Sequence, residues 1–286
     1  IRKKDGRNFF ATTQSVKNVG FVKNVYEFDC RKDTPNYWEN YFAEVIEPFC
    51  GTELSNIISN IESSQNAAVV LSHEDKCNLS VFICHQIFRS PQALEKSIQI
   101  GQKSIERGKK EAQSMLKSSF PPFLHSLLLN ALDNADFSKD EIKDIFMQSM
   151  SDVNRQEERT NALLDKIWIV YQNTTQLQFI TSDNPVCRKN CVTKSFSFED
   201  NTLKDPNSLI LFPLSPTILI EITPSHLLGS RPQKYDGRKF LLGQNDLSFI
   251  AGADTLQILQ CHRQVFMSLN MLQHLDELSK ASKIND

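Results

Sequence analysis

The stretch Leu-Gln-Phe-Ile-Thr-Ser-Asp-Asn-Pro, residues 177–185, places an apolar run directly before a polar turn. A short apolar run bounded by turn-forming residues is typical of a buried β-strand. Asp and Asn before Pro favour a tight turn. The sequence therefore predicts a strand over 177–180 that presents the Asp183 carboxylate and the Asn184 amide at its end.

Other strand patterns surround this stretch on both sides. β-Branched and apolar runs separated by turn signals favour antiparallel pairing. In the C-terminal half they predict strands over 166–171, 177–180, 209–213 and 217–222. The polar segment 186–208 is expected to be a loop. Apolar clusters within residues 1–28 predict two or three short extended segments near the N-terminus.

Helical periodicity dominates the middle of the chain. The expected helices cover 37–63, 72–88, 91–118, 122–132, 138–164 and 245–272. Pro48 and Gly51 are expected to kink or split the first of these helices. The patterns together predict an α+β fold, with a predominantly helical body and a small, mostly antiparallel sheet formed by N- and C-terminal segments. We expect one domain over residues 1–276 and a polar tail over 277–286.

Composition excludes several classes of protein. The chain has 286 residues, a net charge of −2 and 40% hydrophobic residues, which indicates a globular protein without general attraction to nucleic acid or anionic membranes. Its seven cysteines are scattered, which favours free thiols in a reducing compartment and therefore a cytoplasmic location. We see no apolar run near the ~18 residues of a membrane span and no signal peptide, so no membrane partner is expected.

Six groups of residues resemble a known family. In chain order they are Tyr26, Ile46-Glu47, Phe-Ile-Cys-His-Gln-Ile-Phe-Arg-Ser-Pro at 82–91, Trp168, Phe-Ile-Thr-Ser-Asp-Asn-Pro at 179–185, and Leu-Phe-Pro-Leu-Ser-Pro at 211–216. The chain resembles the family catalogued as domain of unknown function 4238, and the last two groups are the most specific. The resemblance implies that these positions group together, and it implies no particular reaction. It also implies a His-x-x-Pro segment upstream of Ile1.

Asp183 and Asn184 have two interpretations. An ionised carboxylate can serve a metal, a water or a substrate hydroxyl, and the adjacent amide offers both a donor and an acceptor. The same residue types before a proline also form turns, in which their side chains bond nearby backbone groups. Both interpretations stay open, and the resemblance raises the functional one.

Glu47, Gln86 and Arg89 form a second candidate group. Gln86 and Arg89 are three residues apart on one helix and share a face. An arginine facing a glutamate is a recurring way to hold a carboxylate or phosphate, and equally a recurring ion pair between helices. The structural interpretation is favoured here. Their neighbour His85 could titrate near neutrality, although a single helical histidine is more often packed.

Other patterns argue against familiar enzyme classes. A metal-dependent nuclease would place Glu-x-Lys on the strand after Asp183, but Glu221 is followed by Thr223 at the lysine position. No Gly-rich phosphate loop, Gly-x-Ser-x-Gly elbow or His-Glu-x-x-His motif occurs. Nucleotide-dependent kinases, ATPases and Rossmann oxidoreductases are therefore disfavoured.

Two further patterns are better explained without a ligand. Lys96, Lys103, Lys110 and Lys117 recur every seven residues, but acidic residues are interleaved with them, so a solvated helix face is favoured over a phosphate-tracking surface. Cys187, Cys191 and Cys261-His262 lack the tight spacing of a zinc knuckle. The sequence therefore assigns no metal ligand.

The leading hypothesis is a hydrolase-like site that acts on nucleic acid or another phosphate ester. Asp183 and Glu47 would be its catalytic acids, Arg89 its anion clamp, and Gln86 and Asn184 its positioning groups. The competing hypothesis is a non-catalytic binding or regulatory module, for example in a defence or toxin system, in which the same cluster is structural. The sequence assigns no cofactor, and nucleic acid is the one macromolecular partner that it leaves open.

Overall fold

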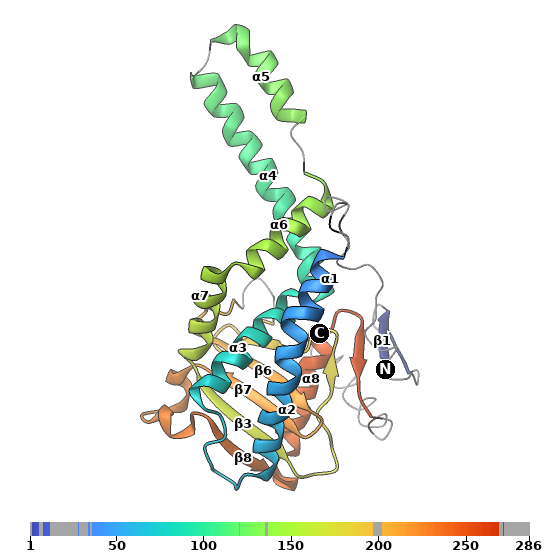
Figure 1. Cartoon of the computed structure of the whole chain (residues 1–286), viewed down its shortest axis with the longest axis vertical. Helices are drawn as coiled ribbons and strands as arrows, with labels where there is room; N and C mark the ends of the chain where they lie inside the picture. Colours follow the sequence, from blue (N-terminus) through green and yellow to red (C-terminus); the bar gives the residue numbers. More distant parts are fainter. Residues whose placement is uncertain are drawn as a thin grey trace.

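The computed structural model describes residues 2–5, 8–11, 28, 34, 36–119, 121–134, 137–196, 202–268 and 271. Helices and two β-sheets form a body, and a hairpin of two helices, α4 (Pro91–Ser119) and α5 (Pro122–Asn134), projects from it (Figure 1). The predicted α+β class with a helical body is confirmed.

The larger sheet is mixed and has five strands in the order β5-β6-β7-β3-β8. The strands are β3 (Ile167–Asn173), β5 (Cys187–Asn190), β6 (Ser208–Ser215), β7 (Ile218–Thr223) and β8 (Arg238–Leu242). All neighbours pair antiparallel except β3 and β8, which are parallel. Every strand of this sheet therefore comes from the C-terminal half of the chain, whereas the sequence analysis expected both chain ends to contribute.

The smaller sheet joins distant parts of the chain. Its order is β2-β1-β9-β4, and each neighbouring pair is antiparallel. The strands are β1 (Arg2–Asp5), β2 (Asn8–Ala11), β4 (Thr181–Ser182) and β9 (Gln264–Phe266). It is in this sheet that N-terminal and C-terminal segments meet.

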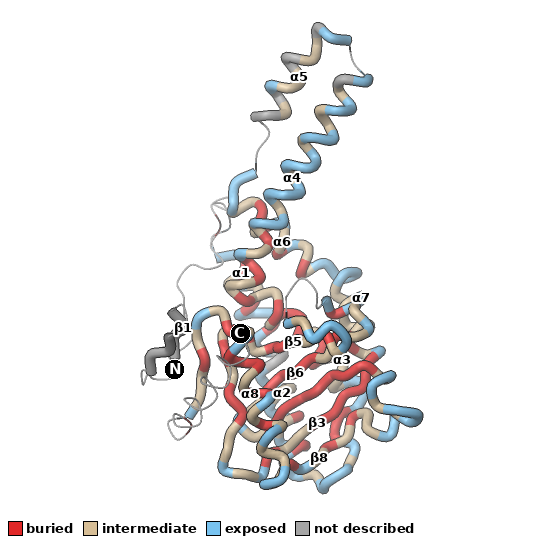
Figure 2. The backbone as a smooth tube through the Cα atoms, turned by 180° about the vertical axis from the view of Figure 1, so that it is seen from behind, coloured by how far each residue is buried: buried red, intermediate tan, exposed pale blue. Residues whose placement is uncertain are grey.

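Helices cover both faces of the larger sheet. On one face, α2 (Glu47–Ser63) and α3 (His73–Phe88) pack against inward-facing strand residues such as Trp168, with the rings of Phe82 and Phe212 5.9 Å apart. On the other face lies α8 (Leu247–Gln260), which contacts Leu211 of β6. The central strand β7 is buried along its whole length, and the strands form a large buried region in Figure 2. Burial on both faces explains the near-continuous apolar character of this strand.

The first predicted helix, 37–63, consists of three pieces. They are α1 (Tyr37–Tyr41), a π-helical segment η3 (Phe42–Ile46) and α2. The irregularity lies before Pro48 instead of at Pro48 and Gly51, and Gly51 is inside a regular helix. Pro48 lies in the first turn of α2, directly after the π-helical segment.

The predicted helix 138–164 is two helices, α6 (Lys139–Ser151) and α7 (Val153–Leu164). Asp152 separates them, because its side chain accepts the backbone N–H of Arg155 at 2.9 Å and caps α7. Ser138 and Glu141 form the predicted capping box at the start of α6.

The C-terminal predictions need larger corrections. The helix expected over 245–272 ends at Gln260, after which the chain turns and forms β9. Residues 177–180 are not a strand; the strand is Thr181–Ser182 itself. Strand β5 lies in the predicted loop, and β8 was not predicted. The expected segments between 12 and 27, Tyr26 and the tail 277–286 lie outside the described residues.

Across the described parts of the chain, no helix combines the length and apolar character needed to cross a membrane.

Candidate functional site

Asp183 organises the turn that follows α8. Its Oδ1 accepts the backbone N–H of His262 at 2.8 Å, and its Oδ2 accepts those of Arg263 at 2.7 Å and Gln264 at 3.0 Å. These residues lead directly into β9. Both carboxylate oxygens therefore stabilise the end of one element and the start of the next, which is the turn-forming role considered for this residue.

The rest of the motif is attached to one face of α8. Asp254 and Gln257, three residues apart on that helix, both bond to it. The Oδ1 of Asp254 accepts the backbone N–H of Ile180 at 3.0 Å. The hydroxyl of Ser182 donates to Oε1 of Gln257 at 2.8 Å, and Nε2 of Gln257 donates to the carbonyl of Pro185 at 2.7 Å. Residues 180–185 are therefore held against α8 by side chains at helical spacing.

Asn184 connects the motif to two helices. It is buried, and its Nδ2 donates to the backbone carbonyl of Gln260 at 3.1 Å and to Oε1 of Gln92 on α4 at 3.4 Å. Its backbone N–H donates to the Ser182 hydroxyl at 3.2 Å. The contacts described for Asn184 are those of a packed structural amide.

Glu47 and Arg89 do meet. Nη2 of Arg89 lies 3.1 Å from Oε1 of Glu47, with the two side chains 32% and 53% exposed respectively. The guanidinium also lies over the ring of Phe42, 4.9 Å from its centroid. Gln86 is partly buried on the same helix. The structure thus brings Glu47 and Arg89 together, while Asp183 and Asn184 make a separate set of contacts.

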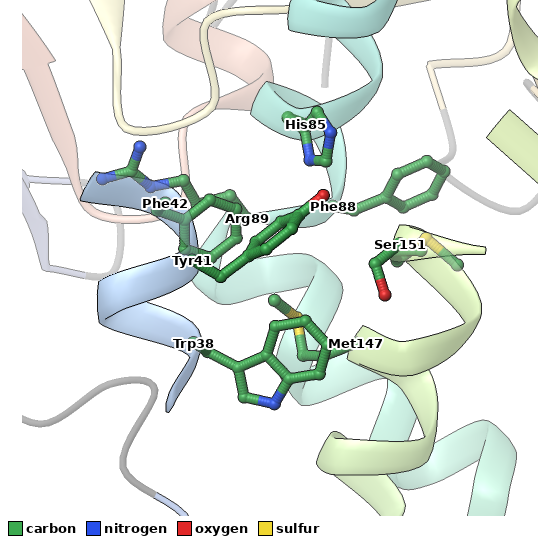
Figure 3. Close-up of a pocket in the computed structure, with 9 residues that line it drawn as sticks. Trp38, Tyr41, Phe42, His85, Phe88, Arg89, Met147 and Ser151 are labelled. Atoms are coloured by element: carbon green, nitrogen blue, oxygen red, sulfur yellow. The ribbon is translucent and has the colours of Figure 1, made fainter. Parts of the chain in front are cut away.

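A small pocket lies where α1, the π-helical segment, α3 and α6 meet; it is partly open to solvent, and its internal volume of about 10 Å³ holds about one water. It is lined by Trp38, Tyr41, Phe42, His85, Phe88, Arg89, Met147, Met150 and Ser151 (Figure 3). Asp144 holds one wall in place, because its Oδ1 accepts Nε1–H of Trp38 at 2.8 Å. None of the nine lining residues is acidic.

His85 is neutral in this pocket. It is buried, and the side-chain amide of Gln156 donates to its Nε2 at 2.9 Å. Burial, followed by the positive charges of Arg159 and Arg89, lowers the pKa of His85 to about 4. The hydroxyl of Tyr41 points toward the His85 ring in Figure 3, and burial raises the pKa of this phenol. Near neutral pH the imidazole of His85 and the phenol of Tyr41 are therefore both uncharged, and they lie close together.

Two arginines border this neutral centre. Arg89 lines the pocket, and the guanidinium of Arg159 lies 4.6 Å from the ring centroid of Phe88, another lining residue. Burial is the main cause that lowers the pKa of Arg159, yet an arginine stays charged near neutrality. The pocket therefore combines aromatic walls with positive charge.

Comparison with known proteins assigns the family. The family described as "Protein of unknown function (DUF4238)" matches residues 1–268. The chain belongs to this family. No curated protein and no solved structure matches the chain. Among the described residues of this DUF4238 protein, no group of His, Cys, Asp and Glu side chains could hold a metal ion.

The sequence analysis missed the pocket because several elements supply its walls, and one of them is a π-helical segment, which contributes Phe42. In this segment the backbone N–H of Glu47 bonds to the carbonyl of Phe42, five residues back. The sequence does contain one signal for the π-helical segment. In a regular α-helix the ring of Pro48 would clash with the backbone carbonyl of Glu44. Single-turn π-helical insertions occur frequently at functional sites. In this DUF4238 chain the insertion places Phe42 beside His85, with ring centroids 6.1 Å apart.

Proposed function

We propose that this DUF4238 chain is a binding module that takes a small ligand over this pocket, with an anionic group on the partly exposed Arg89 and a flat apolar part against the aromatic rings. The observation that carries the proposal is the composition of the pocket: aromatic rings and a neutral His85, bordered by Arg89 and Arg159, with no acidic lining residue. Aromatic rings favour a flat apolar group, and arginines favour a carboxylate or phosphate.

Arg89 is the proposed contact for the anionic group. Its present partner Glu47 is about half exposed, and ion pairs at such positions contribute only about 0–1 kcal/mol. A ligand carboxylate or phosphate can therefore replace Glu47 at little cost. In this proposal Arg89 keeps the anion-binding role expected from the sequence, and Glu47 is a competitor for it.

The hydrolase hypothesis is the alternative proposal. It needs Asp183 and Glu47 as catalytic acids, with Gln86 and Asn184 as positioning groups. The binding proposal is preferred because both oxygens of Asp183 are occupied by backbone N–H groups of the 262–264 turn. No contact among the described residues supports a defence or toxin role, which stays a prediction.

Substitution of Glu47 distinguishes the two proposals, because they expect opposite effects. The probes are inorganic phosphate and benzoate, titrated calorimetrically into the full chain. If the pocket binds anions, Glu47→Gln tightens binding about two- to fivefold by removing the competitor of the ligand, and Arg89→Gln weakens it about tenfold or more. The exposed Glu62→Gln, at the end of α2, is the matched control and leaves binding unchanged.

Two results would contradict the binding proposal. One is the absence of saturable binding of either probe to the wild-type chain. The other is hydrolysis of a phosphate ester that is lost in both Glu47→Gln and Asp183→Asn while both variants remain folded. The second result would establish the hydrolase alternative.

A further inference from the structure

The enclosed part of the pocket beside His85 admits a single small group. Its volume is about 10 Å³, the space of about one water molecule, so no ring of a ligand fits inside it. A ligand of the proposed kind therefore keeps its flat part over the pocket and reaches inside with one substituent. The side chains that line the enclosed part decide which substituent this is.

The charges around the pocket exclude an ion as the inner group. His85 is uncharged near neutral pH, because burial and the neighbouring arginines lower its pKa to about 4. Arg89 is the single charged residue among the nine that line the pocket, and its partly exposed guanidinium lies 3.1 Å from the carboxylate of Glu47. An ion inside the enclosed part would lose its hydration without gaining an opposite charge there. The inner group is therefore uncharged.

The hydrogen-bonding capacity of the lining residues favours a hydroxyl. Within the described part of the chain the hydroxyl of Tyr41 makes no hydrogen bond, so its proton is available to a ligand. The hydroxyl of Ser151 donates to the backbone carbonyl of Gln148 at 3.1 Å, which leaves its oxygen as an acceptor. Nε2 of His85 already accepts from Gln156. A hydroxyl both accepts and donates, so it matches Tyr41 and Ser151 at the same time.

One aromatic ring separates this inner position from the anion site. The ring centroid of Phe42 lies 4.9 Å from Cζ of Arg89 and 6.1 Å from the ring centroid of His85. In Figure 3 the rings of Phe42 and Tyr41 lie between the guanidinium of Arg89 and the side chain of Ser151. A ligand that reaches both places therefore needs its acid and its hydroxyl on different sides of a flat group about one ring wide.

We infer that the ligand class of this pocket is an aromatic acid with a hydroxyl group on its ring. The carboxylate lies on Arg89, the ring lies against Phe42 and Tyr41, and the hydroxyl enters the enclosed part and bonds to Tyr41 and Ser151. This inference rests on the proposed function and goes beyond it, because an anion and a ring alone do not require a hydroxyl. When the two groups occupy adjacent ring carbons, the hydroxyl bonds to its own carboxylate, so the meta and para isomers are the ligands expected.

The test compares ring substituents by calorimetric titration into the full chain at neutral pH, where all of these acids are ionised. The probes are benzoate, 3-hydroxybenzoate, 4-hydroxybenzoate and the two corresponding methoxybenzoates. We expect one hydroxybenzoate to bind about three- to tenfold more tightly than benzoate, which is the strength of about one additional hydrogen bond. The methoxy analogue of that isomer should bind no more tightly than benzoate, because its methyl group exceeds the enclosed volume and its oxygen has no proton to donate.

Two substitutions locate the hydroxyl of the ligand. Tyr41→Phe keeps the aromatic ring and removes its hydroxyl, and Ser151→Ala removes the acceptor. Within each variant we expect the ratio of the affinities for the favoured hydroxybenzoate and for benzoate to fall to about twofold or less. Tyr235→Phe, at a partly buried tyrosine outside the pocket, is the matched control and keeps the wild-type ratio. Circular dichroism and thermal unfolding show that the variants are folded.

The outcomes separate this inference from the proposed function. Saturable binding of benzoate without tighter binding of either hydroxybenzoate would overturn the inference and leave the proposed function standing. A preference for a hydroxybenzoate that persists in both Tyr41→Phe and Ser151→Ala would also overturn it, because the hydroxyl would then lie elsewhere. If neither phosphate nor any of the aromatic acids binds, the proposed function itself is contradicted, and the inference with it.

Discussion

The carboxylate of Asp183 and the backbone N–H of Arg263 are joined by a 2.7 Å hydrogen bond, although 80 residues separate them in the chain. This bond and its two neighbours close the turn between α8 and β9. The residue that looked most catalytic in the sequence is thus placed where it determines how the C-terminal segment folds back.

Removing the Asp183 side chain should destabilise the protein. Asp183→Ala leaves three backbone donors without their charged acceptor, and we expect a loss of about 3 kcal/mol. That loss corresponds to a melting temperature lower by about 5–10 °C in a chain of this size. Differential scanning calorimetry measures it, with the exposed Glu62→Gln as control. A melting temperature within 1–2 °C of the wild type, which corresponds to a stability loss below about 1 kcal/mol, would contradict the structural role.

Glu221 on β7 should make stability fall as the pH rises. Burial raises the pKa of its carboxyl from 4.5 to about 7, while hydrogen bonds from Tyr171 and Thr223 lower it in part. Between these two values the folded state binds more protons than the unfolded state, so the stabilisation is complete below about pH 4.5 and lost above about pH 7. The full change is about 3 kcal/mol. Chemical denaturation of Glu221→Gln from pH 4 to 8 measures this contribution, because the variant lacks the part of the stability that falls as the pH rises.

His85 should produce the opposite trend over nearly the same range. Its pKa falls from 6.5 to about 4 on folding, so the unfolded state binds more protons between these values and stability falls as the pH falls. The contributions of His85 and Glu221 therefore largely cancel in the wild type between about pH 4.5 and 6.5. In His85→Gln we expect the free energy of unfolding to fall as the pH rises, because only the Glu221 contribution remains. In Glu221→Gln we expect it to rise as the pH rises. Two variants with equally flat profiles would contradict both assignments.

Lys239 should be needed for the end of α2. This fully buried ammonium donates to the backbone carbonyls of Ile61, at 2.8 Å, and Ser64, and to Oε1 of Gln172 at 3.0 Å. Lys239→Met preserves the buried chain but removes these donors, which should cost about 2–3 kcal/mol. Urea denaturation measures the loss, and the exposed Lys139→Met is the control. Equal midpoints for the two variants would show that the carbonyls find other donors.

The parts of the fold with local signals were predictable. Ser72 and Ser138 begin α3 and α6 with capping boxes, and Pro91 begins α4, so these boundaries were expected within a residue or two. The β6–β7 hairpin likewise follows from two apolar runs separated by a turn. Such features depend on residues a few positions apart.

The missed features depend on distant partners. The helix expected to reach residue 272 ends at Gln260 because Asp183, far upstream, accepts the N–H groups that follow. The short strand β5 contains Arg188 and Lys189, a poor strand pattern, and forms because β6 offers a pairing edge. Tertiary context overrides local propensity at both places.

The candidate site divides in the same way. Gln86 lies in the last turn of α3 and Arg89 is the residue that caps this helix, and the contact of Arg89 with Glu47 was considered as an ion pair. The pocket beside that pair was not foreseen. The π-helical segment shifts Phe42 relative to a regular helix, and the apolar periodicity of the sequence does not predict a π-helix.

The pairing of Arg2 in β1 with Val265 in β9 has a consequence for biosynthesis. During translation the first strand leaves the ribosome about 260 residues before its partner exists, an interval of about 13–50 s at 5–20 residues per second. Throughout that interval β1 and β2 can form at most an isolated hairpin, which is marginally stable in water. The smaller sheet is thus completed only after β9 has been synthesised, and a nascent chain stopped before residue 264 leaves its first strand without its permanent neighbour.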